Sequence, residues 1–220
     1  MCEKLGECFD KLSVDEKDFL ASQKKQLVYA RGENICKQGA FAPYVLYILD
    51  GMVRIFVESG HDKHLNIAIE NVGSYIGFNT VFGDSVYHYS AVALTDSTIC
   101  MIDKQALNKL FHKNKDFALS IISRNCRTEK LLLSHLRTQT HKQMPGKLAV
   151  ALLYLNKPDL QSKNVYNFLT RKDIADFAGI TPESTIKLLK EFEKDGLIKL
   201  DGKSVVIIDN NKLKELSIRG

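Results

Sequence analysis

The chain has 220 residues, of which 45% are hydrophobic and 26% are charged, and its net charge is +5 at pH 7. These values are typical of an ordinary soluble globular protein with one large domain or two modest ones. A membrane span is excluded because no run of about eighteen apolar residues occurs. The polar N-terminus has no apolar segment of the kind found in signal peptides, so we expect a cytoplasmic protein.

The first hundred residues change from a helical to a strand-like pattern. Residues 5–25 carry apolar side chains at helical spacing, with Ser13 as a cap for the stretch VDEKDFL. Residues 27–101 contain short runs rich in Val, Ile, Tyr and Phe, separated by turns that contain glycine. Gly51 and Gly60 occupy two of these turns, where a hairpin needs unusual backbone angles. Many short strands at this spacing predict an all-β barrel or jelly roll.

The cysteines do not follow a recognisable disulfide or metal-binding pattern. The chain has five, namely Cys2, Cys8, Cys36, Cys100 and Cys126. An odd, scattered set in a cytoplasmic chain argues against disulfides, and the lack of a CxxC pair argues against a structural zinc, so no metal site is expected. Cys36 and Cys100 lie in strand-like segments, where we expect buried, inert thiols, whereas Cys2 and Cys8 are candidates for exposed thiols.

The pattern returns to helix after Asp103. Residues 104–114 predict a short helix, and residues 116–143 predict one long helix, since they contain no Gly or Pro. The apolar stripe of this long helix needs a partner, and a second copy of the helix is the simplest one, which predicts a homodimer. The alternative is that the helix packs only on its own barrel. The residues expected at the dimer seam are Ile121, Ile122, Leu132 and Leu136.

The last third of the chain predicts a helix-turn-helix. Met144-Pro145-Gly146 is expected to break the long helix and to form a hinge before a helix over residues 147–155. The stretch that follows from position 170 reads TRKDIADFAGITPESTIKLLKEF. Its apolar spacing predicts two short helices, with Gly179 ending the first in a left-handed conformation. Thr181 is a good N-cap for the second helix, and Pro182 suits its first position.

A hairpin completes this segment. Residues 197–200 and 204–208 predict two strands around the turn Asp201-Gly202-Lys203. Helices followed by a hairpin make a winged helix-turn-helix. Residues 141–220 contain 14 Lys/Arg against 10 Asp/Glu, a balance of +4, whereas the rest of the chain has a balance of +1. An excess of positive charge at this end suits a polyanion such as DNA.

An enzyme finds no support in the sequence motifs. The chain has no phosphate-binding GxxxxGK[ST] loop, no GxSxG and no HExxH. No catalytic residue is therefore proposed.

Together these segments resemble the Crp/Fnr family of bacterial transcription regulators over nearly the whole chain. The resemblance is carried by LTRKDIADFAGITPESTIKLLKEFEKDGLIKLDGKSVVI and by the roll segments GENICKQG, YILDGMVRIF and GSYIGFNTVF. It implies an α+β fold with an N-terminal β-roll or jelly roll and flanking helices, a long dimerisation helix and a C-terminal winged helix-turn-helix. The corresponding domains are a cyclic-nucleotide-binding-like sensor (1–115), the dimerisation helix and hinge (116–143) and the DNA-binding domain (144–220).

The resemblance also implies which residues touch DNA. The helix over 182–194 is the recognition helix, whose first turns face base edges in the major groove. Glu183 matches the position that accepts from a cytosine amino group, and Lys187 the position that addresses guanine. Pro182 stands where relatives often carry a basic residue, which indicates a changed operator. The expected phosphate contacts are Thr170, Arg171, Ser184 and Lys203.

The effector is not readable from the sequence. The segment that holds the cyclic nucleotide in some family members reads here GSYIGFNTVFGDSVYHYSAVAL. Phe78 stands at the usual Glu position and Tyr89 at the position of the phosphate-binding Arg, so control by cAMP in the usual way is not expected. The cysteines also lack the tight spacing of the iron–sulfur members, and the cofactor is unknown. The candidate effector pocket comprises Phe78, Asn79, Thr80, His88, Tyr89 and Ser90.

The sequence therefore predicts a homodimeric transcription regulator. We expect it to bind an approximately palindromic double-stranded operator under the control of an unidentified small-molecule effector, with RNA polymerase as the candidate protein partner. The alternative is a small-molecule-binding protein whose winged helix mediates protein association without reading DNA. That alternative predicts an apolar or acidic surface on the second helix, whereas Glu183, Ser184, Lys187 and Lys190 are expected to be exposed there.

Overall fold

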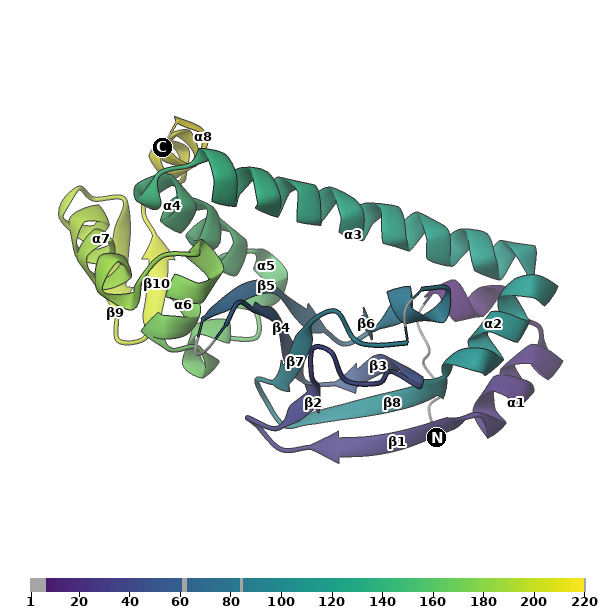
Figure 1. Ribbon diagram of the computed structural model, residues 1–220. Helices are drawn as coiled ribbons and strands as arrows, with labels where there is room; N and C mark the ends of the chain where they lie inside the picture. The colour runs from purple at the N-terminus through teal and green to yellow at the C-terminus, as the bar shows by residue number, and fades with distance from the viewer. Residues whose placement is uncertain (1–6, 61–62, 84, 220) are drawn as a thin grey trace. The chain divides into compact units, whose positions relative to one another are not determined.

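The computed structural model describes residues 7–60, 63–83 and 85–219 (Figure 1). The chain divides into two compact units, one made of residues up to 58 together with 68–131, the other of residues 59–67 together with 132–220. None of the described helices has the length and apolarity that crossing a membrane requires.

The first unit contains the predicted β-roll, built from antiparallel strands. One sheet has the order β1 (Lys24–Tyr29), β8 (Ser97–Asp103), β3 (Tyr44–Asp50), β6 (Tyr75–Ile76). The other has the order β2 (Asn34–Cys36), β7 (Ser90–Ala93), β4 (Met52–Glu58), β5 (His64–Asn71). The α+β fold class with an N-terminal roll is confirmed.

Helices precede and follow the strands of the roll in the sequence, and one short helix lies between two of these strands. They are η1 (Glu7–Lys11), α1 (Val14–Ser22), η2 (Phe78–Val81), α2 (Lys104–Lys113) and the long helix α3 (Lys115–His141). The predicted cap is confirmed, because the Ser13 hydroxyl accepts from the Glu16 amide (3.3 Å) and the Glu16 carboxylate accepts from the Ser13 amide (3.0 Å). The single helix expected over 5–25 is instead η1 and α1, and Lys24 already begins β1.

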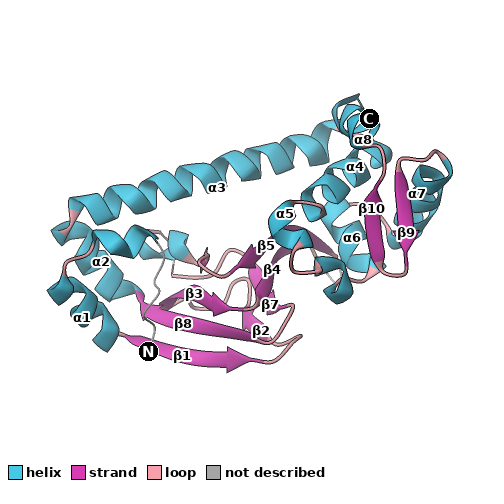
Figure 2. Ribbon diagram, turned by 180° about the vertical axis from the view of Figure 1, so that it is seen from behind, coloured by secondary structure: helices cyan, strands magenta, loops and turns pink. Residues whose placement is uncertain are grey.

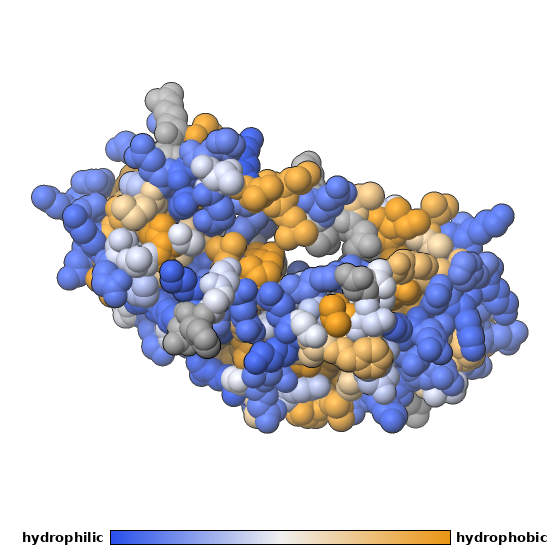
Figure 3. All heavy atoms as spheres, viewed as in Figure 1, coloured by the Kyte–Doolittle hydropathy of each residue, from blue (hydrophilic) through white to orange (hydrophobic). Residues whose placement is uncertain are grey.

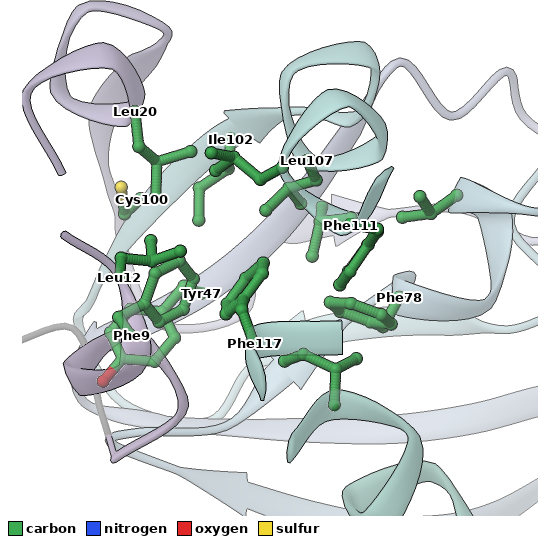
Figure 4. Close-up of a cluster of buried hydrophobic side chains, with 14 residues drawn as sticks. Phe9, Leu12, Leu20, Tyr47, Phe78, Cys100, Ile102, Leu107, Phe111 and Phe117 are labelled. Carbon is green, nitrogen blue, oxygen red and sulfur yellow. The ribbon is translucent and has the colours of Figure 1, made fainter. Parts of the chain in front are cut away.

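An aromatic cluster joins the long helix to the roll (Figure 4). The rings of Phe111 and Phe117 stack with centroids 5.1 Å apart, and Phe9 lies 5.3 Å from Phe117. Ile121, one turn after Phe117, belongs to the same buried cluster and is only 3% exposed. The assignment of Ile121 to a dimer seam is therefore wrong, because its side chain packs into its own roll.

Two local predictions for the roll are confirmed. Gly51 has φ +93° in the β3–β4 turn, where a Cβ would lie 2.6 Å from the Asp96 carbonyl oxygen, so only glycine fits. Cys36 and Cys100 are buried in strands, and burial raises the pKa of the Cys36 thiol to about 12, which keeps it protonated and unreactive. Cys2 and the side chain of Cys8 lie outside the described residues.

The second unit contains the predicted winged helix-turn-helix (Figure 2). Its elements are α4 (Met144–Leu155), α5 (Pro158–Gln161), η3 (Val165–Phe168), α6 (Arg171–Ala178), α7 (Pro182–Lys194), β9 (Ile198–Asp201), β10 (Ser204–Ile207) and α8 (Asn210–Arg219). The sequence did not indicate α5, η3 or α8. The break after the long helix lies at residues 142–143, because Met144-Pro145-Gly146 forms the first turn of α4, where proline is well tolerated.

Helix α4 is the centre of this unit. It packs against α6, α7 and α8, and its side chains Leu148, Leu152 and Leu155 are fully buried. This apolar core fixes the positions of α6 and α7, and it leaves their polar faces outside.

Candidate nucleic-acid interface

The turn between α6 and α7 is built from the signals that the sequence carries. Gly179 adopts the left-handed conformation (φ +65°) that ends α6, as predicted. Thr181 caps α7, with its hydroxyl oxygen accepting from the Ser184 amide at 3.2 Å, and Pro182 occupies the first turn. Gly179, Thr181 and Pro182 therefore define the turn and the start of α7 through their local conformational preferences.

One face of α7 is buried and another is open to solvent. Its apolar and hydroxyl positions Thr185, Leu188, Leu189 and Phe192 are buried, as predicted. The Thr185 hydroxyl donates to the Thr181 carbonyl oxygen at 3.0 Å, which satisfies the polar group on this face. The opposite face presents the exposed side chains of Glu183, Lys187 and Lys190.

This exposed stripe has the donors and acceptors that base edges require. The Lys187 ammonium lies 4.0 Å from the Glu191 carboxylate, but both side chains are well exposed (79% and 51%), so the pair is weak and the ammonium stays available. Glu183 stands in the first turn of α7 as an exposed acceptor. This stripe of α7 is therefore not the apolar or acidic surface that protein association alone would predict.

Ile186 is a candidate contact that the sequence reasoning missed. Its side chain is 45% exposed between Glu183 and Lys187, although most apolar residues of α7 are buried. An exposed apolar group beside this polar stripe is suited to contact the methyl group of thymine. The available signal was that Ile186 falls outside the buried period of Thr185, Leu188 and Leu189.

Thr170 and Ser184, the two hydroxyl residues expected to contact phosphates, differ in whether their hydroxyl proton is free to be donated. The Thr170 hydroxyl caps α6 and donates to the Asp173 carboxylate at 2.7 Å, so its proton already has an acceptor. The Ser184 hydroxyl accepts from Thr181 at 3.2 Å and keeps its own proton for another acceptor. Both phosphate contacts remain predictions, and Ser184 is the better placed of the two.

Arg171 has a structural role that the sequence did not reveal. Its guanidinium donates to the Gly202 carbonyl oxygen (3.0 Å) and to the Lys203 carbonyl oxygen (3.2 Å). These bonds tie the first turn of α6 to the turn of the β9–β10 wing. Arg171 therefore positions the wing, and with it the exposed side chain of Lys203.

In the roll, the polar groups of Ser90 and Tyr89 in the candidate effector pocket are already hydrogen-bonded to other residues of the roll. The Ser90 hydroxyl donates to the Glu58 carboxylate at 2.6 Å and accepts from the Gln38 amide at 2.9 Å. The Tyr89 hydroxyl accepts from the Gly77 amide at 2.7 Å, and burial raises the pKa of Tyr89 to about 12, so this phenol stays neutral.

The remaining pocket candidates do not supply a positive charge. Thr80 is buried and its hydroxyl donates to the Gly77 carbonyl oxygen at 2.7 Å. Phe78 packs edge-on against Phe111 in the aromatic cluster, with centroids 5.7 Å apart. Asn79 and His88 are exposed.

A further apolar face remains on α3. Apolar side chains reach the surface along this helix (Figure 3), and the large ones are 47–61% exposed. Positions 119, 122, 126, 129, 133 and 136 follow one another at alternating intervals of three and four, which is the spacing of a coiled-coil seam. Among the described side chains of α3, the exposed large apolar residues are Leu119, Ile122, Leu132, Leu133 and Leu136.

A metal centre is not evident in the part of the chain that the structure describes, since no group of three or more His, Cys, Asp or Glu side chains is arranged to hold an ion.

Comparison with known proteins identifies the domain type of both parts of the chain. A model of the cyclic nucleotide-binding domain matches residues 26–114, and a model of the Crp-like helix-turn-helix domain matches residues 146–216. Electron transport regulator A of Shewanella oneidensis is 24% identical over 210 residues, which cover 93% of this chain and 82% of the relative. The CRP-like cAMP-activated global transcriptional regulator of Mycobacterium tuberculosis is 23% identical over 198 residues, or 88% of either chain.

Solved structures share the fold. A CooA variant from Carboxydothermus hydrogenoformans superimposes with a TM-score of 0.74 at 21% identity, covering 99% of this chain and 97% of that one. FixK2 from Bradyrhizobium japonicum gives a TM-score of 0.72 at 18% identity, covering 88% and 96% of the two chains.

Replacing Arg171 by Ala should loosen the wing turn without unfolding the unit, because two hydrogen bonds to backbone carbonyls are lost at an exposed site. We expect the lysine-specific endoprotease Lys-C to cut after Lys203 several-fold faster in Arg171→Ala than in the parent. Lys172→Ala, a change at the neighbouring exposed residue, serves as the control. Equal cleavage rates in all three proteins would contradict the positioning role of Arg171.

Proposed function

The chain belongs to the Crp/Fnr family of transcription regulators, and we propose that it acts as a homodimer that reads a two-fold symmetric DNA site with α7. The observation that carries this proposal is the division of α7 into a buried apolar face and an exposed stripe of Glu183, Lys187 and Lys190. The protein acts where its DNA lies, in the cytoplasm, and RNA polymerase is its candidate protein partner.

The DNA contacts follow from the chemistry of the exposed stripe. Glu183 accepts from a cytosine amino group, and Lys187 donates to guanine O6 or N7. Lysine is a point donor without the planar fork of arginine, so its preference for guanine is weaker. Pro182 offers no side-chain donor, and the base pair opposite it is therefore read less strictly. Ser184 and Lys203 contact phosphates, Arg171 holds the wing near them, and Thr170 does so only by giving up its bond to Asp173.

The dimer forms along α3. The exposed residues Ile122, Leu132 and Leu136 lie on a face that the described part of the chain leaves open, and Leu119 and Leu133 extend it at coiled-coil spacing. Burying such a side chain stabilises a complex by about 1.5–3 kcal/mol, so a second copy of the helix gains substantially from covering five of them. A dimer with one α7 per half-site binds sites about one helical turn apart.

The effector is not an anionic cyclic nucleotide bound in the usual way. The Glu58 carboxylate, 2.6 Å from the Ser90 hydroxyl, occupies the place where a phosphate would accept from that hydroxyl. Two anions at this spot repel each other strongly in a partly buried environment. The neutral Tyr89 stands in place of the cation that would balance a phosphate.

For DNA reading, Lys187→Ala should cost about 1–3 kcal/mol on the preferred duplex and relax the preference at one base pair. Lys203→Ala should weaken binding to all duplexes alike and lower the slope of log K against log salt by about one. Fluorescence anisotropy on duplexes selected from a random pool measures both effects, with Lys214→Ala on α8 as the control. If Lys187→Ala weakened all duplexes alike, Lys187 would be a phosphate contact.

For the dimer, Leu136→Glu should give a monomer, since two carboxylates would face each other across the seam. Sedimentation equilibrium on the full chain at micromolar concentration measures this. Ser134→Glu adds the same charge on an exposed part of α3 off the seam and should remain dimeric. A monomeric parent, or a dimeric Leu136→Glu protein, would overturn the proposed seam.

For the effector, isothermal titration calorimetry of the full chain with cAMP should show no saturable heat up to about 1 mM, which corresponds to a binding free energy no stronger than about 4 kcal/mol. A micromolar Kd would contradict the assignment of Glu58 and Tyr89 as groups that exclude the phosphate.

A further inference from the structure

A groove in the second unit lies on a face of α7 that the proposed DNA contacts do not use. The groove has a volume of about 470 Å³ and is lined by residues of α7 and α8 together with Pro145 at the start of α4 and Leu197 beside β9. Its α7 residues are Leu188, Glu191 and Phe192, followed by the C-cap Asp195, whereas Glu183 stands in the first turn of the helix. At 3.6 residues per turn, the groove face is turned about a third of the way round the helix from the Glu183–Lys187 stripe.

The floor of the groove is apolar. Leu188 and Phe192 of α7 and Leu197 line it and are themselves buried, and Pro145 and the half-buried Leu216 of α8 continue the apolar lining. These side chains belong to four separate segments that meet only in the folded unit. An open apolar floor of this kind favours an apolar side chain of a ligand or partner over water.

The walls of the groove carry mostly negative charge. Glu191 and Asp195 stand on the α7 side, and Glu215 stands on the α8 side, all three exposed. The one cation of the lining, Lys212, lies 3.5 Å from the carboxylate of Asp209, the residue just before α8, and the three carboxylates of the walls outnumber it. The groove therefore presents carboxylates on both sides of an apolar strip.

This combination identifies the chemistry of the occupant. DNA is unsuitable, because the carboxylates would repel its phosphates. An amphipathic helix of a partner protein fits, if its apolar side chains enter the floor and its Lys or Arg side chains reach both walls. We infer that the α7–α8 groove docks a basic amphipathic helix of a protein partner.

The inference goes beyond DNA reading and does not depend on it. The groove and the exposed stripe of Glu183, Lys187 and Lys190 occupy different faces of α7 and meet where the Glu191 carboxylate lies 4.0 Å from the Lys187 ammonium, so DNA and a partner can be bound at once. A protein held in this groove would then sit beside DNA that is bound to the same α7.

The test uses the full chain and a labelled peptide of about 15 residues, with leucines at i, i+3, i+4 and i+7 and lysines on the flanking positions. A matched peptide has glutamates in place of the lysines. By fluorescence anisotropy we expect the lysine peptide to bind at least tenfold more tightly than the glutamate peptide. This preference should shrink as salt is raised from about 50 to 300 mM.

Variants of the chain test whether the lysine peptide binds in the groove. The double variant Glu191→Lys/Glu215→Lys changes two exposed groove walls and should weaken the lysine peptide at least tenfold. The control Asp18→Lys/Asp159→Lys carries the same charge change at exposed carboxylates outside the groove and should alter binding less than twofold. Leu216→Ala shortens the half-buried edge of the floor and should weaken binding several-fold, with circular dichroism showing that each variant is folded.

Four results would overturn the inference. They are the absence of lysine-peptide binding, equal binding of both peptides, equal effects of the groove and control variants, and a change in the oligomeric state of the chain in Glu191→Lys/Glu215→Lys. The last result would assign the groove to a second copy of the chain. DNA binding of Leu216→Ala is a separate readout, because Leu216 lies on α8 and makes none of the proposed DNA contacts; loss of peptide binding with intact DNA binding in this variant concerns the groove alone.

Discussion

The structure depends on a helix with two apolar faces, only one of which the described chain covers. One face of α3 (Lys115–His141) places Phe117 and Ile121 in the aromatic core of the roll. The other leaves Leu119, Ile122, Leu133 and Leu136 at the surface. In the first unit the aromatic core fixes Phe117 and Ile121, so Leu119 and Ile122 begin an apolar strip on the exposed side of the helix. Such a strip is what a second copy needs for a seam with a fixed register.

The two units meet different physical demands. The roll fills its interior with aromatic packing and with hydrogen bonds among its own groups, and the Ser90 hydroxyl is already bonded to the Glu58 carboxylate. The winged unit anchors α7 through Leu188, Leu189 and Phe192, so the polar residues of the helix need not contribute to folding. Because packing is separate from recognition, the exposed residues of α7 can change without loss of the fold.

Local signals were readable from the sequence, and distant pairings were not. The turn at Gly179 and the caps at Thr181 and Ser13 follow from neighbouring residues, so the structure confirms them. Ile121 and Ile122 are adjacent and equally apolar, and only the fold decides that the first faces inward. Arg171 reaches carbonyls more than thirty residues away, and Ser90 pairs with Glu58 at a similar separation. Helix α8 was missed because its polar sequence has only a weak apolar stripe.

The central claim is that two copies of α7, related by a two-fold axis, read one DNA site. Hydroxyl-radical footprinting of the ligand-free protein on a duplex selected from a random pool tests it most directly. We expect two protected segments related by two-fold symmetry, with centres about one helical turn (about 10 base pairs) apart. A single protected segment, or uniform protection that disappears with salt, would contradict two copies of α7 reading one two-fold symmetric site.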